Sequence, residues 1–228
     1  MRMLVAMLAV GLLHAGAAVA GPFVLVEQER SYEWSTTSSE DPPTGALFEA
    51  SDFGSFMTSG HDSTLSSAAL VGDLSARGSA SGPHPETETV VQADFRVVFD
   101  LLAPKTLDLD GRLEIRDPYF FDLGRSSLTL SFFDTGLGSF QPIFARNAPS
   151  AFGDAFFVDE RFHDLPAGRY QLEATADGRG FWGSQGDITG TGIVEFTLTT
   201  PEPGTGVLAA SMLACLVARR RRRSRAGA

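Results

Sequence analysis

The sequence contains few side chains whose spacing could support catalysis. Three histidines lie between the two ends of the chain, at His61, His84 and His163. Asp62 and Ser63 follow His61, but adjacent residues cannot form a catalytic triad, whose members meet through the fold. His84 lies between two prolines and His163 precedes a turn, so all three are predicted to be solvated polar residues. The sequence has no serine-nucleophile elbow, zinc-protease motif or phosphate-binding loop.

Asp108, Asp110 and Gly111 match the opening of a calcium-binding loop, which brings several oxygens to one ion. The parity of the apolar residues argues against such a loop, because Leu107 and Leu113 keep the same phase on both sides of Gly111. We therefore expect a continuous strand with its acidic residues on the solvent face, and no metal site or other cofactor.

Trp182, in a glycine-rich run over 178–192, could stack on a sugar ring if it is exposed, with contributions from Trp34, Tyr119 and Phe120. Most tryptophans are largely buried, so packing in the core or at an edge is the favoured alternative. The many carboxylates could also contain a glycosidase pair, but no spacing singles one out.

The segment from 21 to 200 alternates apolar and polar residues with a period of two, as half-buried strands do. No part of it has a helical period over three turns. We expect a single all-β domain, an antiparallel β-sandwich or jelly roll, with loops at 35–45 and 78–89. The clearest predicted strands are 94–101, 107–115, 128–132, 169–176 and 194–198; further candidates are 23–34, 46–58, 66–76, 140–146 and 155–162.

The predicted domain is strongly acidic and contains no cysteine. Of 28 acidic residues only Glu202 lies outside 21–200, whereas seven of the 18 basic residues do, so the domain has a net charge of −16. This charge disfavours nucleic-acid partners. The lone cysteine, Cys215, lies near the C-terminus, so the domain must be stable without disulfides.

The N-terminus has the three parts of a cleavable signal peptide. Met1-Arg2-Met3 is a short basic start, and an apolar run of ten residues follows over 4–13. Small residues then lead to Ala18-Val19-Ala20, an A-x-A cleavage site that would leave Gly21 as the new N-terminus. We therefore expect 1–20 to be removed after passage through the secretion translocon; an uncleaved anchor is the alternative.

The C-terminus combines three pieces in a fixed order: Pro201-Glu202-Pro203, fifteen uncharged residues over 204–218, and an arginine cluster. A helix over 204–218 would span about 22 Å, short of the hydrocarbon core of about 30 Å, so it is a marginal anchor. The basic residues would keep this end in the cytoplasm. They are Arg219, Arg220, Arg221, Arg222, Arg223 and Arg225.

This arrangement resembles the PEP-CTERM sorting signal of exported proteins in Gram-negative bacteria, with Pro201, Glu202 and Pro203 on the family's motif. The resemblance covers 201–225. It implies recognition by an exosortase, cleavage near 201–203, and release or attachment at the cell surface after transient insertion in the inner membrane. It also implies a link to exopolysaccharide or biofilm matrix. A plain single-pass membrane protein is the alternative.

The sequence therefore predicts a non-enzymatic surface or matrix protein with three parts: a signal peptide over 1–20, an acidic domain over 21–200 and a sorting tail over 201–228. A carbohydrate-binding module and a secreted hydrolase that uses carboxylates are the alternatives.

We predict that the mature protein lacks the residues that follow about position 203, because the tail inserts in the membrane only until it is cleaved off. Mass spectrometry of the termini of surface-exposed protein measures this directly. Recovery of Arg225 in that protein, or unchanged export after deletion of 202–228, contradicts the prediction.

Overall fold

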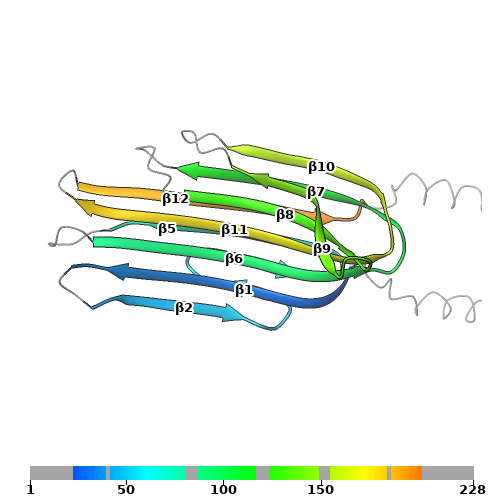
Figure 1. Ribbon diagram of the computed structural model, residues 1–228, viewed down its shortest axis with the longest axis horizontal. Helices are drawn as coiled ribbons and strands as arrows, with labels where there is room; N and C mark the ends of the chain where they lie inside the picture. The colour runs from blue at the N-terminus through cyan, green and yellow to red at the C-terminus, as the bar shows by residue number, and fades with distance from the viewer. Residues whose placement is uncertain are drawn as a thin grey trace, which may run out of the picture.

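The computed structural model describes residues 23–39, 42–80, 87–116, 124–148, 155–183 and 186–201. In this part of the chain the fold is all-β, every strand pairing is antiparallel, and no helix is present (Figure 1). The strands are β1 (Phe23–Thr37), β2 (Thr44–Ala50), β3 (Ser55–Met57), β4 (His61–Leu65), β5 (Ala69–Gly78), β6 (Thr87–Leu101), β7 (Lys105–Arg116), β8 (Gly124–Asp134), β9 (Ser139–Asn147), β10 (Phe156–Leu165), β11 (Gly168–Gly183) and β12 (Gly186–Thr199).

The strands form two layers that face each other. We call β2-β1-β6-β11-β8-β9 sheet A and β3-β4-β5-β12-β7-β10 sheet B. The end of β11 pairs with the start of β12, from Gly180 with Thr189 to Gly183 with Gly186, and this pairing joins the two sheets. The result is a sandwich whose sheet is nearly closed into a barrel, which confirms the predicted antiparallel all-β class.

The core lies between the sheets and is built by the predicted alternation. On β6, Phe95, Val97 and Phe99 point inward and are almost fully buried, as are Tyr170 and Leu172 on β11. Phe95 of sheet A meets Phe196 of sheet B with ring centroids 4.8 Å apart in an edge-to-face contact. Burial of these apolar side chains is the principal stabilising term in a domain that has no disulfide.

Several predicted boundaries shift in the structure. The segment 46–58 is two strands, β2 and β3, separated by bends at 52–54. The predicted loops 35–45 and 78–89 are shorter than expected. β1 continues to Thr37 at the start of the first loop, and β6 begins at Thr87 near the end of the second. Part of the glycine-rich run is also strand, at the end of β11 and the start of β12.

Glycines allow the two sheets to touch where β11 joins β12. A Cβ atom on Gly178 would lie 2.1 Å from the carbonyl oxygen of Ala76, and one on Gly192 would lie 2.1 Å from that of Arg125. A Cβ atom on Gly78 would lie 2.4 Å from the backbone nitrogen of Gly180, and one on Gly180 would lie 2.6 Å from the backbone carbonyl carbon of Gly78. Only glycine permits such an approach, so this run forms a junction between the sheets.

A buried arginine links β1 to the segment that connects sheet A with sheet B. Arg30 is 1% exposed, and its guanidinium donates hydrogen bonds to the carbonyl oxygens of Asp52 (2.6 Å) and Gly54 (3.0 Å). It also donates to Gln28 Oε1 (2.8 Å) and to Ser63 Oγ (3.3 Å) on β4. Gln28 in turn donates to the carbonyl oxygens of Ala50 and Asp52. These bonds replace the hydration of the guanidinium, and they hold residues 50–54 in place.

Tyr170, at the start of β11, is fully buried, and its hydroxyl donates to the carbonyl oxygen of Pro166 at 2.8 Å. A tyrosine that bonds back to the backbone a few residues upstream is a feature of β-sandwich corners. Burial raises the pKa of Tyr170 to about 12.

We predict that Gly178→Ala destabilises the domain by about 1–3 kcal/mol, because the new methyl group must displace backbone atoms of the opposite sheet. Chemical denaturation measures the change in the free energy of unfolding. Gly136→Ala is the control, since its Cβ would meet only the Asp134 side chain at 3.2 Å. Equal effects of the two substitutions would contradict a junction that depends on glycine.

Candidate functional site

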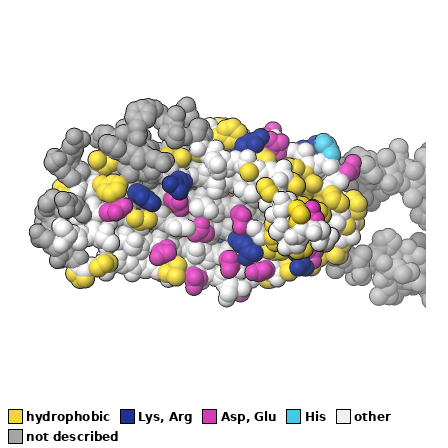
Figure 2. All heavy atoms as spheres, viewed as in Figure 1, with side chains coloured by type: hydrophobic (Ala, Val, Ile, Leu, Met, Phe, Trp, Pro, Cys, Tyr) yellow, Lys and Arg dark blue, Asp and Glu magenta, His cyan; other side chains and the backbone are white. Residues whose placement is uncertain are grey.

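The outer face of sheet A carries a polar groove of about 880 Å³. Outward-facing residues from five strands line it in two rows that the strand register sets. One row runs across the sheet through Glu49, Ser31, Asp94, Thr175 and Ser127, and the other through Glu29, Arg96, Glu173 and Thr129. Charged side chains of both signs are interspersed over this face (Figure 2).

Arg96 is the cation at the centre of the groove. Its guanidinium lies 3.1 Å from Glu27, 3.3 Å from Glu29 and 3.9 Å from Glu173, and it donates to the side-chain oxygen of Gln171. These partners come from β1 and β11, on either side of β6. They fix the guanidinium, which can present its remaining donor capacity to an oxygen-rich ligand.

Asp94, next to Arg96 on the same face, accepts a hydrogen bond of 2.6 Å from Gln92. Burial raises the pKa of the Asp94 carboxyl above its usual value, although hydrogen bonds from Gln92 and Thr175 act in the opposite direction. Burial, followed by the charge of Asp94, also raises the pKa of Asp177, whose Oδ1 atom has no hydrogen-bond partner among the described residues. The groove therefore combines carboxylates, hydroxyls and the Arg96 guanidinium, a donor and acceptor set that suits the hydroxyls of a sugar.

The sequence did not single out these residues. Asp94, Arg96 and Glu173 occupy the polar positions of the predicted strands 94–101 and 169–176, and the structure places them on the outer face of sheet A. The missing information was the strand register, which brings β6, β11, β8, β1 and β2 side by side.

The predicted sugar-stacking residue does not line this groove. Trp182 lies near the end of β11, where it pairs with Thr87 of β6, and it is half-buried. Trp34 is half-buried against the core. Tyr119 and Phe120 lie outside the described residues. Among the described lining residues, Phe95 is the single aromatic, and its side chain belongs to the core.

The prediction that all three histidines are solvated was wrong for His61. This side chain is 1% exposed, and its ring lies edge-on to Phe56 with centroids 4.8 Å apart. Its Nδ1 is 3.2 Å from the carbonyl oxygen of Ser31, and its Nε2 has no partner among the described residues. Burial lowers the pKa of His61 to about 4, and the positive charge of Arg30 acts in the same direction. His163 is exposed as predicted, and His84 lies outside the described residues.

The predicted continuous strand across Gly111 is confirmed as β7, but its polar face is only partly exposed to solvent. Glu114 is 4% exposed and is held by Arg112 and Arg116, and the hydrogen bond from Arg116 is the main cause that lowers its pKa. Asp108 is paired instead with Arg161 across the β7–β10 ladder. In the described part of the chain, no three His, Cys, Asp or Glu residues are grouped so that they could hold a metal ion.

The predicted addressing segments fall almost entirely outside the described residues. Pro201 is exposed directly after β12, whereas Glu202, Pro203, the apolar run and the arginine cluster are not described. The same holds for Ala18, Ala20 and Gly21 of the predicted signal cleavage site. None of the described residues forms a helix that could cross a membrane.

The sequence matches no family model, and it matches no curated protein. Among solved structures, the chain is similar to the enzymatically active domain of tailspike protein 4 of bacteriophage CBA120 (13% identity over 56% of this chain and 19% of that one, TM-score 0.28). It is also similar to the MgGH51 α-L-arabinofuranosidase (15% identity, 58% and 22%, TM-score 0.25). A third similar structure is the K3 cleaved adhesin domain of Lys-gingipain from Porphyromonas gingivalis (11% identity, 57% and 74%, TM-score 0.27). The chain thus spans about a fifth of the length of the first two of these proteins, and the likenesses carry no functional argument.

We predict that acidification destabilises the domain through His61. The folded-state pKa of about 4 lies below the ordinary value of 6.5, so the unfolded chain binds more protons between these pH values. Stability therefore falls as the pH is lowered from 6.5 to 4, by about 3 kcal/mol at most. The measurement is the free energy of unfolding against pH.

His61→Asn keeps a donor for the Ser31 carbonyl but cannot titrate, so its profile should be flatter over that window. His163→Asn, at an exposed position, serves as the control and should keep the profile of the unmodified chain. If His61→Asn also keeps that profile, His61 does not carry the pH dependence.

Proposed function

We propose that this chain is an exported cell-surface or matrix protein, delivered by the PEP-CTERM route and without enzymatic activity of its own. Signal peptidase would release the domain at Gly21, and an exosortase would cut near Pro201-Glu202-Pro203. The order of these sequence elements supports the proposal, together with the exposure of Pro201 directly after the last strand. The exposure of Pro201 would let a protease reach this point of the chain after the domain has folded.

The described ends of the domain lie close together, which suits a protein handled at a membrane from both termini. The backbone N–H of Phe23 donates to the carbonyl oxygen of Ser67 at 3.2 Å. Thr199, at the end of β12, pairs with Ala69, which lies two residues after Ser67 in the chain. An N-terminal signal segment and a C-terminal apolar segment would thus leave the sandwich at the same end. The groove lies on the outer face of sheet A rather than at that end, so it would stay open to the surroundings.

The groove favours a second, more specific function, binding of a neutral polysaccharide. It crosses five strands, it is lined by carboxylates and hydroxyls around the Arg96 guanidinium, and its net negative charge disfavours acidic polymers. A protein deposited among exopolysaccharide would use such a surface for retention. The alternative of a hydrolase that uses carboxylates would place its acids in this same groove.

We predict that Arg96→Ala weakens binding of neutral hexose oligosaccharides roughly tenfold or more, because a charge-assisted donor is lost and Glu27, Glu29 and Glu173 remain unpaired. Calorimetric titration of the exported protein measures the affinity. Arg169→Ala removes an exposed arginine that is paired with Asp100 near the end of the same sheet, and it should leave the affinity unchanged.

Equal binding by the unmodified protein and Arg96→Ala would contradict a groove site. A loss confined to Trp182→Ala would move the site to the end of β11. Release of shorter sugars during the titration would support the hydrolase alternative.

A further inference from the structure

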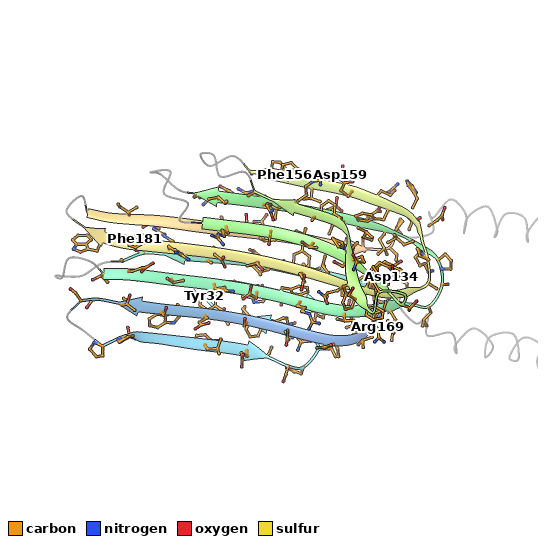
Figure 3. The ribbon with its side chains drawn as sticks, viewed as in Figure 1. Tyr32, Asp134, Phe156, Asp159, Arg169 and Phe181 are labelled. Carbon is orange, nitrogen blue, oxygen red and sulfur yellow. The ribbon has the colours of Figure 1, made fainter. Side chains whose placement is uncertain are left out.

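The turns at one end of the sandwich carry exposed apolar side chains. We call this the tail end, defined by Phe23, Pro201 and the turns at 66–68, 102–104, 135–138 and 166–167. The register brings these segments together, because Leu101 pairs with both Phe23 and Gly168. In Figure 3, Asp134 and Arg169 lie at the tail end and Phe181 lies at the opposite end.

Two leucines project most strongly there. Leu102, in the β6–β7 turn, is 73% exposed, and Leu137, in the β8–β9 turn, is 67% exposed. Val24 and Val26 at the start of β1 are each 39% exposed. Figure 2 shows hydrophobic side chains gathered at this end of the viewed face.

The polar groups of the same end are largely satisfied within the protein. Asp100 and Arg169 form a two-bond ion pair with distances of 2.9 and 3.1 Å. Asp134 accepts hydrogen bonds from the backbone N–H groups of Gly136 and Leu137, which fixes the turn that presents Leu137. A hollow of about 560 Å³ lies beside this ion pair, and Leu102, Phe133 and Ala167 contribute to its lining. The end therefore presents apolar side chains beside an internally paired Asp100–Arg169 and a hydrogen-bonded Asp134, and clustered exposed apolar side chains are typical of surfaces that contact lipid.

The chain itself fixes what this end would face. Pro201 belongs to the tail end, and the uncharged run over 204–218 begins three residues later. Three residues reach about 10 Å at full extension. If 204–218 enters a bilayer, as the proposed function requires, the tail end cannot stand further from the membrane than a headgroup layer.

We propose that the tail end seats on the bilayer surface, with Leu102 and Leu137 in the interfacial region, while the sorting tail is inserted. This inference rests on the proposed function. The occupant is zwitterionic lipid, because a domain of net charge −16 is repelled by anionic lipid. The contact holds the 201–203 motif at the membrane surface, where a membrane-embedded protease would cut it.

Fluorescence quenching in vesicles tests the contact on the full chain. Leu102→Cys, Leu137→Cys and, at the exposed far end of β1, Thr37→Cys are made singly with Cys215→Ser, and each is labelled with the fluorophore NBD. The unmodified chain is labelled at Cys215, inside the apolar run, to report insertion of the tail. Each protein is reconstituted in phosphatidylcholine vesicles that contain nitroxide-bearing lipid.

We expect lipid nitroxide to quench the labels at 102, 137 and 215, and aqueous iodide alone to quench the label at 37. Adding Leu102→Asp to the Leu137→Cys chain should reduce lipid quenching at 137. Met57→Asp, at a side chain that is 78% exposed on β3, should leave it unchanged. Circular dichroism confirms that each variant keeps its β structure.

Quenching at 215 without quenching at 102 and 137 overturns the seated contact and leaves the proposed function standing. Absence of quenching at all three positions overturns both. If the labels at 102 and 137 are shielded from iodide only when vesicles also contain exosortase, the tail end binds the protease rather than lipid, and the proposal fails.

Discussion

The fold depends on the burial of one positive charge. Arg30 lies in the interior of a sandwich, and its hydrogen bonds end on backbone carbonyls, an amide and a hydroxyl rather than on a carboxylate. Burial lowers the pKa of this guanidinium, and the charge of Asp52 acts against that effect. Since the acceptors belong to β1, β4 and the 50–54 segment, the charge is tolerated only when all three are in place. The arginine thereby specifies how the chain crosses from one sheet to the other.

The sheets are also joined at the glycine junction, where their backbones come into direct contact because no side chain separates them. Between the two lies the aromatic core, in which Phe95 bridges to Phe196. Sheet A is therefore held to sheet B at these two places, and its outer face carries the polar residues of the groove. The raised pKa of Asp94 in the groove is consistent with this division, because burying a carboxylate costs free energy that the rest of the fold supplies.

The local alternation of apolar and polar residues predicted the strands well, but it predicted less well which side chains are buried and which strands lie side by side. The alternation at 169–176 and the constant parity across Gly111 placed β11 and β7 correctly, because each depends on neighbours in sequence. Arg30 could not be predicted to be buried, since a bulge between Leu25 and Glu27 changes which parity of β1 faces inward. The burial of His61 on β4 depends on contacts with Phe56 and with the Ser31 carbonyl, and the Ser31 contact is set by the tertiary fold. The role of Gly178 could not be predicted from the glycine-rich run, because it comes from a close approach to Ala76, about a hundred residues away in the chain. The groove required the same long-range register.

The position of β11 has a consequence for how the chain reaches its folded state. This strand lies between β6 and β8 and also supplies the junction to β12, yet it is second to last in order along the chain. If the polypeptide is exported through a pore from its N-terminus, as we propose, the early strands lack their central partner until residue 183 has emerged. Closure that waits for such distant segments is slow, so under the proposed export the chain would stay extended during its passage. The absence of cysteine over the same span means that no oxidation step can trap it part-way.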